Sequence, residues 1–149
     1  MSLKSLIDKA LSKQPLAKPS RIKKQRNAQP EAIEQERVIK WARDNENNYP
    51  FLWLLHSSLN GVKLSKKQAG RAKQQGMLSG VPDLFLPVPR NNFHGLYIEM
   101  KNEKGRVSVS QSRFLSVTNE LGYQSIVCYS SEDAIQKIKE YLKNGHHVR

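Results

Sequence analysis

The stretch from Val81 to Lys101 constrains the fold of this chain more than any other part of its sequence. Val81–Val88 and Gly95–Lys101 are short and mostly apolar, and a loop containing PRNNFHG joins them. Pro82 has no N–H to give to a sheet ladder, so it belongs at the start of a strand. The pattern predicts two neighbouring strands that can pair as a hairpin.

The rest of the chain alternates between helical and strand patterns. The other expected elements, in chain order, are a helix over 31–45, a strand over 50–55, a helix over 65–75, a helix over 110–121, a strand over 123–129 and a helix over 131–143. We expect Ser65 to cap the second helix, Gly76 to end it, and Phe114, Leu115 and Leu121 to point inward from the third. This order predicts an α/β fold in which helices flank a central mixed sheet.

The basic residues are concentrated near the N-terminus. The chain has 25 Lys and Arg against 13 Asp and Glu, a net charge of +12, and residues 1–30 hold eight basic residues and one acidic residue. Leu3, Leu6 and Leu11 fall at helical spacing before Pro15. We therefore divide the chain into a basic arm with a short amphipathic helix, residues 1–30, and a folded domain, residues 31–149. The excess of positive charge predicts a nucleic acid as partner.

The composition also limits the cellular compartments in which we expect this chain. Cys128 is the single cysteine, which excludes an intramolecular disulfide and a multi-cysteine zinc site, and its apolar surroundings predict a buried structural thiol. No apolar run approaches the roughly 20 residues needed to cross a bilayer, and no secretory signal is visible. We expect a reducing, intracellular compartment, no membrane contact and no small-molecule cofactor.

Glu99 and Lys101 share one face of the second hairpin strand. Successive side chains of a strand alternate between its faces, so both point away from Ile98 and Met100, which face the core. Such a pair is either an ordinary surface ion pair or part of a catalytic site.

Asp83 makes the catalytic interpretation possible. It follows Pro82 at the start of an apolar strand, and hairpin pairing would bring it close to Glu99. Two converging carboxylates suit Mg²⁺, which prefers hard oxygen ligands and keeps several waters. A bound ion would neutralise a scissile phosphate and activate a water, with Lys101 orienting that water or stabilising the charge that develops. The spacing alone is degenerate and also fits a solvated pair beside a turn residue.

A longer set of segments resembles the VRR-NUC branch of the PD-(D/E)XK nucleases, a family common in phages and DNA repair enzymes. The resemblance runs from about residue 31 to residue 142. The segments that carry it are EAIEQERVIKWA, HSSLNG, AGRAKQQGMLSG, GVPDLFLP, GLYIEMK, KGRVSVSQ and LGYQSIVCYSSEDAIQKIKEYL. It implies a restriction-endonuclease-like core. If the chain is phage-encoded, its compartment would be the cytoplasm of a bacterial host.

The resemblance also implies roles for individual residues. Asp83 and Glu99 would bind Mg²⁺ or Mn²⁺ together with the backbone carbonyl of Met100, and Lys101 would be the catalytic lysine. Gln111 would lie near the site, although a plain exposed residue in a first helical turn fits its position equally well.

The family places a further acid on its first helix. Here we favour Glu31, which shares a face with Val38 and Ala42; Glu34 remains an alternative, and Glu36 is expected to be solvated.

Other polar residues have weaker signals. His56 at a strand end is more often a hydrogen-bonded loop residue than a catalytic one, and the remaining histidines carry no metal-binding pattern. The candidate phosphate-binding residues are Lys63, Lys66, Lys67, Arg71, Lys73, Lys104 and Arg106. A solvated basic helix would look the same; if these residues bind DNA, we expect recognition of backbone shape without sequence preference.

Stand-alone members of the family look like homodimers that cut branched DNA, including four-way junctions. The resemblance therefore implies a structure-selective, metal-dependent DNA endonuclease that leaves 3′-hydroxyl and 5′-phosphate ends. Two symmetric active sites would suit the two strands cut in a junction. A monomeric flap or nick nuclease, a non-catalytic nucleic-acid-binding protein and an RNA substrate are the alternatives.

Overall fold

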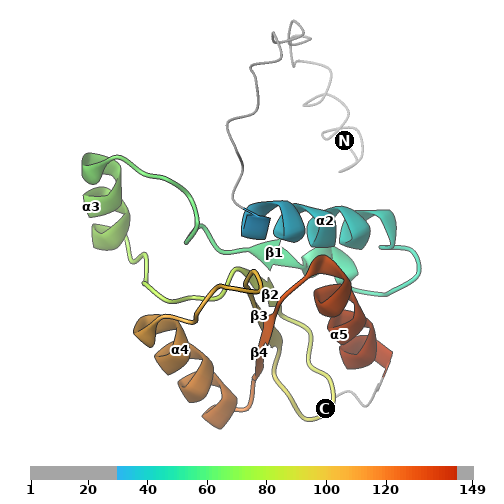
Figure 1. Ribbon diagram of the computed structural model, residues 1–149. Helices are drawn as coiled ribbons and strands as arrows, with labels where there is room; N and C mark the ends of the chain where they lie inside the picture. Colours follow the sequence, from blue (N-terminus) through green and yellow to red (C-terminus); the bar gives the residue numbers. More distant parts are fainter. Residues whose placement is uncertain (1–29, 144–149) are drawn as a thin grey trace, which may run out of the picture.

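A computed structural model describes residues 30–143, which form a four-stranded sheet with helices on both faces (Figure 1). The elements in chain order are α2 (Pro30–Asp44), η1 (Leu52–Leu54), β1 (His56–Ser57), α3 (Lys66–Gln74), β2 (Leu84–Leu86), β3 (Leu96–Met100), α4 (Val109–Glu120), β4 (Gln124–Cys128) and α5 (Ser131–Lys143). This arrangement confirms the predicted α/β class with a mixed sheet. The proposed N-terminal arm and its helix lie outside the described residues.

The sheet has the strand order β1-β2-β3-β4, with antiparallel pairs β1–β2 and β2–β3 and a parallel pair β3–β4. The predicted hairpin is present, and its loop turns at Asn91 and Asn92, which both have positive φ. Asparagine tolerates this left-handed conformation better than most residues. The parallel pair requires a crossover, which α4 supplies.

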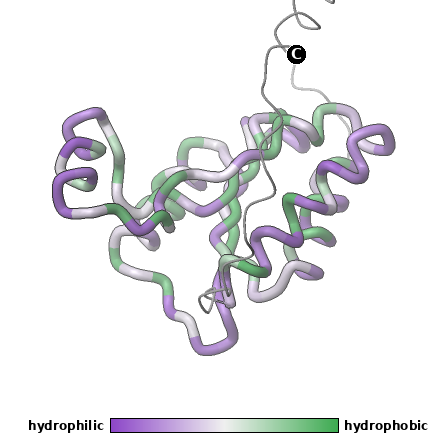
Figure 2. Tube along the Cα trace, turned by 90° about the horizontal axis from the view of Figure 1, so that it is seen from above, coloured by the Kyte–Doolittle hydropathy of each residue, from purple (hydrophilic) through white to green (hydrophobic). Residues whose placement is uncertain are grey.

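The two faces of the sheet carry different side chains. Leu84, Leu96 and Ile98 face α2 and α5 and are completely buried in an aliphatic core that includes Val38 and Ile138. Along the tube in Figure 2, the central strands are correspondingly hydrophobic and α3 is largely hydrophilic.

Aromatic rings occupy the α4 face. Phe85 stacks on Tyr97 with ring centroids 4.2 Å apart, and Phe114 of α4 meets Tyr97 edge-on at 5.2 Å. The same face continues toward the start of β2 and the end of β3, where Asp83, Glu99 and Lys101 lie.

Residues 50–55 do not form the predicted strand. Phe51 adopts a left-handed conformation with φ 70°, and a short 3-10 helix, η1, follows it. Leu52 and Leu55 are buried while Trp53 is 59% exposed, so burial recurs every three residues rather than every two. The strand on this side is limited to His56–Ser57.

Two smaller predictions are also wrong. Leu121 does not point inward as expected; it follows the last residue of α4 and is 62% exposed. The first hairpin strand covers only Leu84–Leu86 rather than 81–88, since Pro82 cannot donate to the ladder at its start.

Cys128 ends β4 inside the core and is completely buried, as predicted. Burial, with a smaller contribution from the charge of Asp133, raises the pKa of its thiol to about 12. Among residues 30–143, no helix has both the length and the apolar character needed to span a bilayer.

Candidate active site

Asp83 lies immediately before β2 and is fixed against the neighbouring strand. Its Oδ2 accepts a hydrogen bond from the backbone N–H of Met100 at 2.8 Å. Pro82, which precedes Asp83 in the chain, is buried, and β2 begins only at Leu84. The carboxylate therefore meets β3 at the end of the hairpin instead of turning into solvent.

The same register leaves the carbonyl oxygen of Met100 without a donor on the neighbouring strand. Leu84 pairs with Ile98, so continuing the antiparallel ladder by two residues would place Pro82 opposite Met100. A residue at such a position normally donates its N–H to the facing carbonyl, and proline has none to donate. The Met100 carbonyl therefore receives no ladder hydrogen bond from this position, on the side of the strand where its N–H contacts Asp83.

Glu99 and Lys101 form a buried ion pair on the α4 face of β3. Lys101 Nζ lies 2.7 Å from Glu99 Oε1, and the two side chains are only 10% and 1% exposed. Gln111 Nε2, from the first turn of α4, donates a hydrogen bond to the same Glu99 oxygen. Glu99 Oε2 is buried and has no hydrogen-bond partner among the described residues.

The environment opposes full ionisation of both carboxyl groups. Burial raises the pKa of Asp83, against the hydrogen bond from Met100 and the charge of Lys101. Burial likewise raises the pKa of Glu99, against the hydrogen bond from Lys101. Added positive charge would therefore stabilise the ionised forms of both groups.

Lys101 is held in its charged form. Burial alone would lower the pKa of Lys101, but its hydrogen bond with Glu99 and the charges of Glu99, Glu31 and Asp83 outweigh burial, and the pKa is raised. The side chain is therefore an ammonium ion at neutral pH, suited to stabilising negative charge and unsuited to accepting a proton.

Of the acids on the first helix, the structure places Glu31 beside this group. Glu31 Oε1 accepts hydrogen bonds from the backbone N–H and the side-chain amide of Asn102, each at 3.2 Å. Its charge contributes to the raised pKa values of Asp83 and Glu99. Glu34 instead accepts the Ser131 N–H at the start of α5, and Glu36 is exposed.

The oxygens of this group suit a divalent cation. The group offers a buried Glu99 oxygen that has no hydrogen-bond partner in the described part of the chain, the Asp83 carboxylate and the Met100 carbonyl. These are hard oxygen donors of the kind that Mg²⁺ prefers. Within residues 30–143, no group of three or more His, Cys, Asp and Glu side chains is arranged to hold a metal. Water would therefore have to fill the remaining positions, as is usual for Mg²⁺.

The histidines of the described region contact residues other than Asp83, Glu99 and Lys101. His56 Nδ1 is 2.8 Å from the Leu54 carbonyl oxygen, and its ring meets Phe85 edge-on. His94 packs against Tyr123 at the far end of the hairpin. The other two histidines lie outside the described residues.

The predicted phosphate-binding residues are exposed and fall in two groups. Lys63, Lys66, Lys67, Arg71 and Lys73 lie on or just before α3, while Lys104 and Arg106 lie in the loop after β3. No acidic residue occurs in the sequence between Glu46 and Asp83. The α3 region therefore carries basic residues and no acidic ones. The next element in the chain is β2, which begins just after Asp83.

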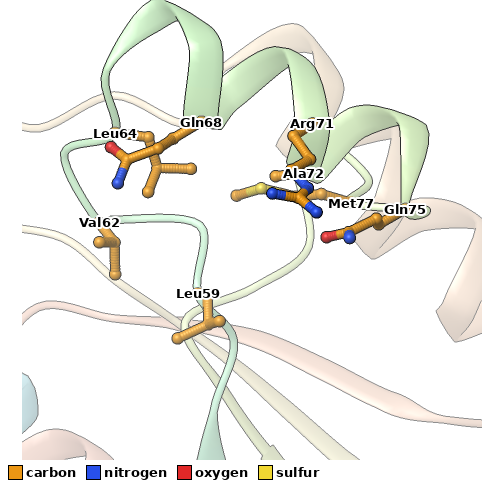
Figure 3. Close-up of a pocket in the computed structure, with 8 residues that line it drawn as sticks. All are labelled: Leu59, Val62, Leu64, Gln68, Arg71, Ala72, Gln75 and Met77. Atoms are coloured by element: carbon orange, nitrogen blue, oxygen red, sulfur yellow. The ribbon is translucent and has the colours of Figure 1, made fainter.

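Helix α3 stands apart from the sheet and buries none of its residues (Figure 1). Beneath it lies a hollow of about 270 Å³ between the helix and the preceding loop (Figure 3). Leu59, Val62 and Met77 contribute to its apolar lining, and Arg71 also lines it.

Sequence reasoning missed two residues, Asn102 and Gly105. The segment NEKG has the composition of a turn, which is a local signal. The contact between Asn102 and Glu31 joins positions 71 residues apart, and nothing in the local sequence predicts it.

Comparison with known proteins gives a consistent family and fold. The model of the VRR-NUC domain family matches residues 29–132. A solved structure of a VRR_NUC domain protein is similar with a TM-score of 0.66 and 24% sequence identity, covering 80% of this chain and 93% of that one. A search of curated proteins finds no match.

Proposed function

This chain belongs to the VRR-NUC domain family, and on that premise we propose that it is a metal-dependent endonuclease that hydrolyses phosphodiester bonds in DNA. One observation carries the proposal: Asp83, Glu99 and Lys101 come together at one end of the hairpin, and a buried Glu99 oxygen there has no hydrogen-bond partner within residues 30–143. An ordinary surface ion pair would be exposed to water, whereas this pair is buried beside a second acid whose ionisation burial opposes.

Each residue of the group has a role in such a reaction. Asp83, Glu99 and the Met100 carbonyl would hold Mg²⁺ or Mn²⁺, an ion that neutralises a scissile phosphate and makes water a better nucleophile. Lys101 would stabilise the negative charge that develops on the phosphate or orient the attacking water. Gln111 would keep Glu99 in place through its hydrogen bond. The expected products carry 3′-hydroxyl and 5′-phosphate ends.

We further propose that the substrate is branched DNA, such as a four-way junction, cut by a homodimer. The resemblance to stand-alone members of the family supports this proposal, and two symmetric sites would match the two strands of a junction. The positive charge of α3, the loop after β3 and the N-terminal arm would bind phosphates without reading bases. A monomeric flap or nick nuclease would use the same chemistry on a different DNA shape.

The first experiment is cleavage of labelled four-way junction, flap and plain duplex with Mg²⁺, Mn²⁺ or EDTA. Asp83→Asn and Lys101→Ala should abolish cleavage and leave DNA binding largely intact. Asp44→Asn, an exposed acid on α2 paired with Lys40, is the matched control and should cut like the unmodified protein.

Paired symmetric cuts in the junction would support a dimeric resolvase, and cuts in flaps alone would favour the monomeric alternative. A matching set of RNA substrates tests the choice of sugar. Tight binding with no metal-dependent cleavage of any substrate would overturn the enzyme proposal and leave a nucleic-acid-binding protein.

A further inference from the structure

The turn that follows β3 has a fixed geometry. The backbone N–H of Gly105 donates to the Asn102 carbonyl at 2.9 Å, and the N–H of Lys104 donates to the Asn102 side-chain oxygen at 3.0 Å. The oxygen of the Asn102 amide is therefore used inside the turn. Its nitrogen is left to point out of the turn, toward α2.

Two donors of Asn102 converge on a single oxygen of Glu31. The backbone N–H and the side-chain Nδ2 both lie 3.2 Å from Glu31 Oε1. Because the turn fixes the amide, Glu31 is held by a preorganised pair of donors instead of by a mobile side chain.

Gly105 also lies against the Glu31 carboxylate, and it leaves no room there for a side chain. A Cβ on Gly105 would lie 2.9 Å from Glu31 Oε1 and 3.2 Å from Lys101 Cδ. A side chain here would push Glu31 or Lys101 out of place. The turn thus encloses the Glu31 carboxylate against the side chain of Lys101.

The hydrogen-bond donors to Glu31 are neutral, and this separates it from the next acid of the same helix. Glu34 is paired with Arg37 at 2.6 Å, so its charge is partly balanced. The amide and N–H of Asn102 orient Glu31 without adding a positive charge of their own. The negative charge of Glu31 acts on Asp83, Glu99 and Lys101. Glu31, Asp83 and Glu99 are nevertheless not arranged as a group of three metal ligands.

We propose that Asn102 is a positioning residue that holds the Glu31 carboxylate beside Asp83, Glu99 and Lys101, so that the first turn of α2 adds a fixed negative charge to the site. The inference rests on the proposed nuclease function and adds a residue to its machinery. Asn102 acts through Glu31, by orienting the helix acid relative to the strand acids.

The test is a double-mutant cycle between positions 31 and 102, read in two ways. Mn²⁺ binding to the full-length protein is measured by electron paramagnetic resonance, and junction cleavage is measured as kcat and KM separately. Asn102→Ala should lower Mn²⁺ affinity and kcat by about 10-fold, a usual effect for a group that orients a site residue, with KM for DNA little changed. In the Glu31→Gln background the same change should have almost no further effect.

Asn102→Asp separates the turn from the contact with Glu31. Aspartate keeps the oxygen that accepts the Lys104 N–H, so the turn and the folded state should survive, but it turns an acceptor toward Glu31. We expect a larger loss of kcat than for Asn102→Ala. Asn92→Asp, which adds the same charge in the loop at the far end of the hairpin, is the matched control and should leave kcat unchanged. Gly105→Ala should reproduce the loss by displacing Glu31.

The outcomes are decisive in either direction. Equal losses from Asn102→Ala with and without Glu31→Gln would show that Asn102 acts independently of Glu31 and would overturn the inference. So would wild-type kcat and Mn²⁺ affinity in the Asn102 variants. If the unmodified protein binds Mn²⁺ but cuts no nucleic acid, the nuclease proposal fails, and the binding cycle still decides whether Asn102 positions Glu31.

Discussion

Helices α3 and α4 begin with the same hydrogen-bonded device but have different places in the molecule. In both, a serine N-cap and a glutamine three residues later bond reciprocally: Ser65 with Gln68, and Ser108 with Gln111. The backbone-to-side-chain distances, 2.9 and 3.2 Å, are the same in the two capping boxes.

The difference lies in what surrounds each box. Helix α4 packs on β4 and buries Leu115 and Thr118, while α3 buries nothing. Gln111 also donates its amide to Glu99, whereas Gln68 lines the hollow under α3 (Figure 3). Local sequence thus decides where each helix starts, and tertiary packing decides whether that start also contacts the candidate site.

The largest expected difference comes from removing the two glutamines. Gln111→Ala should lower kcat by roughly 10- to 100-fold, because Glu99 loses one of the two partners that orient its Oε1. Gln68→Ala removes the equivalent half of the other box and should leave kcat unchanged. Single-turnover cleavage of the preferred DNA measures both.

Equal effects of the two glutamine changes on kcat would show that the contact between Gln111 and Glu99 has no part in catalysis. Circular dichroism of both variants, with unchanged helix content, would exclude a loss of fold as the cause.

The second difference concerns charge. Lys67→Ala and Arg71→Ala on α3 should weaken DNA binding for all sequences alike. Each should also reduce the slope of log affinity against log salt by about 1, because one phosphate fewer is neutralised. Lys137→Ala on α5, also exposed, is the matched control and should leave the slope unchanged. Fluorescence anisotropy at several salt concentrations gives the slopes, and an unchanged slope would remove α3 from the DNA-binding surface.

The serine caps should differ in how far their loss spreads. Ser108→Ala should lower the free energy of unfolding by about 1 kcal/mol, because α4 is part of the packed domain. Ser65→Ala should fray α3 and leave the midpoint of global denaturation in place, since that helix buries no residue. Urea denaturation measures the free energy of global unfolding in both variants, and amide hydrogen exchange measures the local stability of α3. An equal loss of global stability in the two variants would mean that α3 unfolds together with the core.

The start of α5 provides the smallest and most pH-dependent effect. The hydrogen bond from the Ser131 N–H holds the pKa of Glu34 below its usual value of 4.5. The stabilisation is therefore complete above pH 4.5 and disappears as the pH falls through the lower pKa of the folded state. Glu34→Gln should cost on the order of 0.5–1 kcal/mol at pH 7, and its deficit relative to the unmodified protein should shrink below pH 4.5. If the loss of stability in Glu34→Gln stayed constant with pH, the charge of Glu34 would not be its cause.

The fold was predictable wherever local sequence and tertiary packing agree. Residues 131–143 carry a clear apolar stripe and form α5 over that range. Residues 50–55 are as apolar as the residues of a buried strand. The left-handed conformation of Phe51 depends on tertiary packing and has no signal in the local sequence. Apolar character predicted burial there and failed to predict conformation.

The candidate site follows the same division. Alternation along β3 is enough to place Glu99 and Lys101 on one face, and the hairpin then brings Asp83 to them. The choice of Glu31 over Glu34 depends on where α2 lies relative to the turn after β3, which helical periodicity alone leaves open. The contact of Asn102 with Glu31 could not be predicted, because it joins two residues 71 positions apart in the chain.

The buried thiol of Cys128 makes it possible to measure local opening of the fold by the rate of thiol labelling. It is the single cysteine of the sequence, it is completely buried, and burial raises its pKa to about 12. A disulfide reagent needs an exposed thiolate, so it should react only when β4 and α5 separate. The rate of labelling would report the opening of that part of the sheet in the unmodified protein, with no dye, tag or substitution introduced.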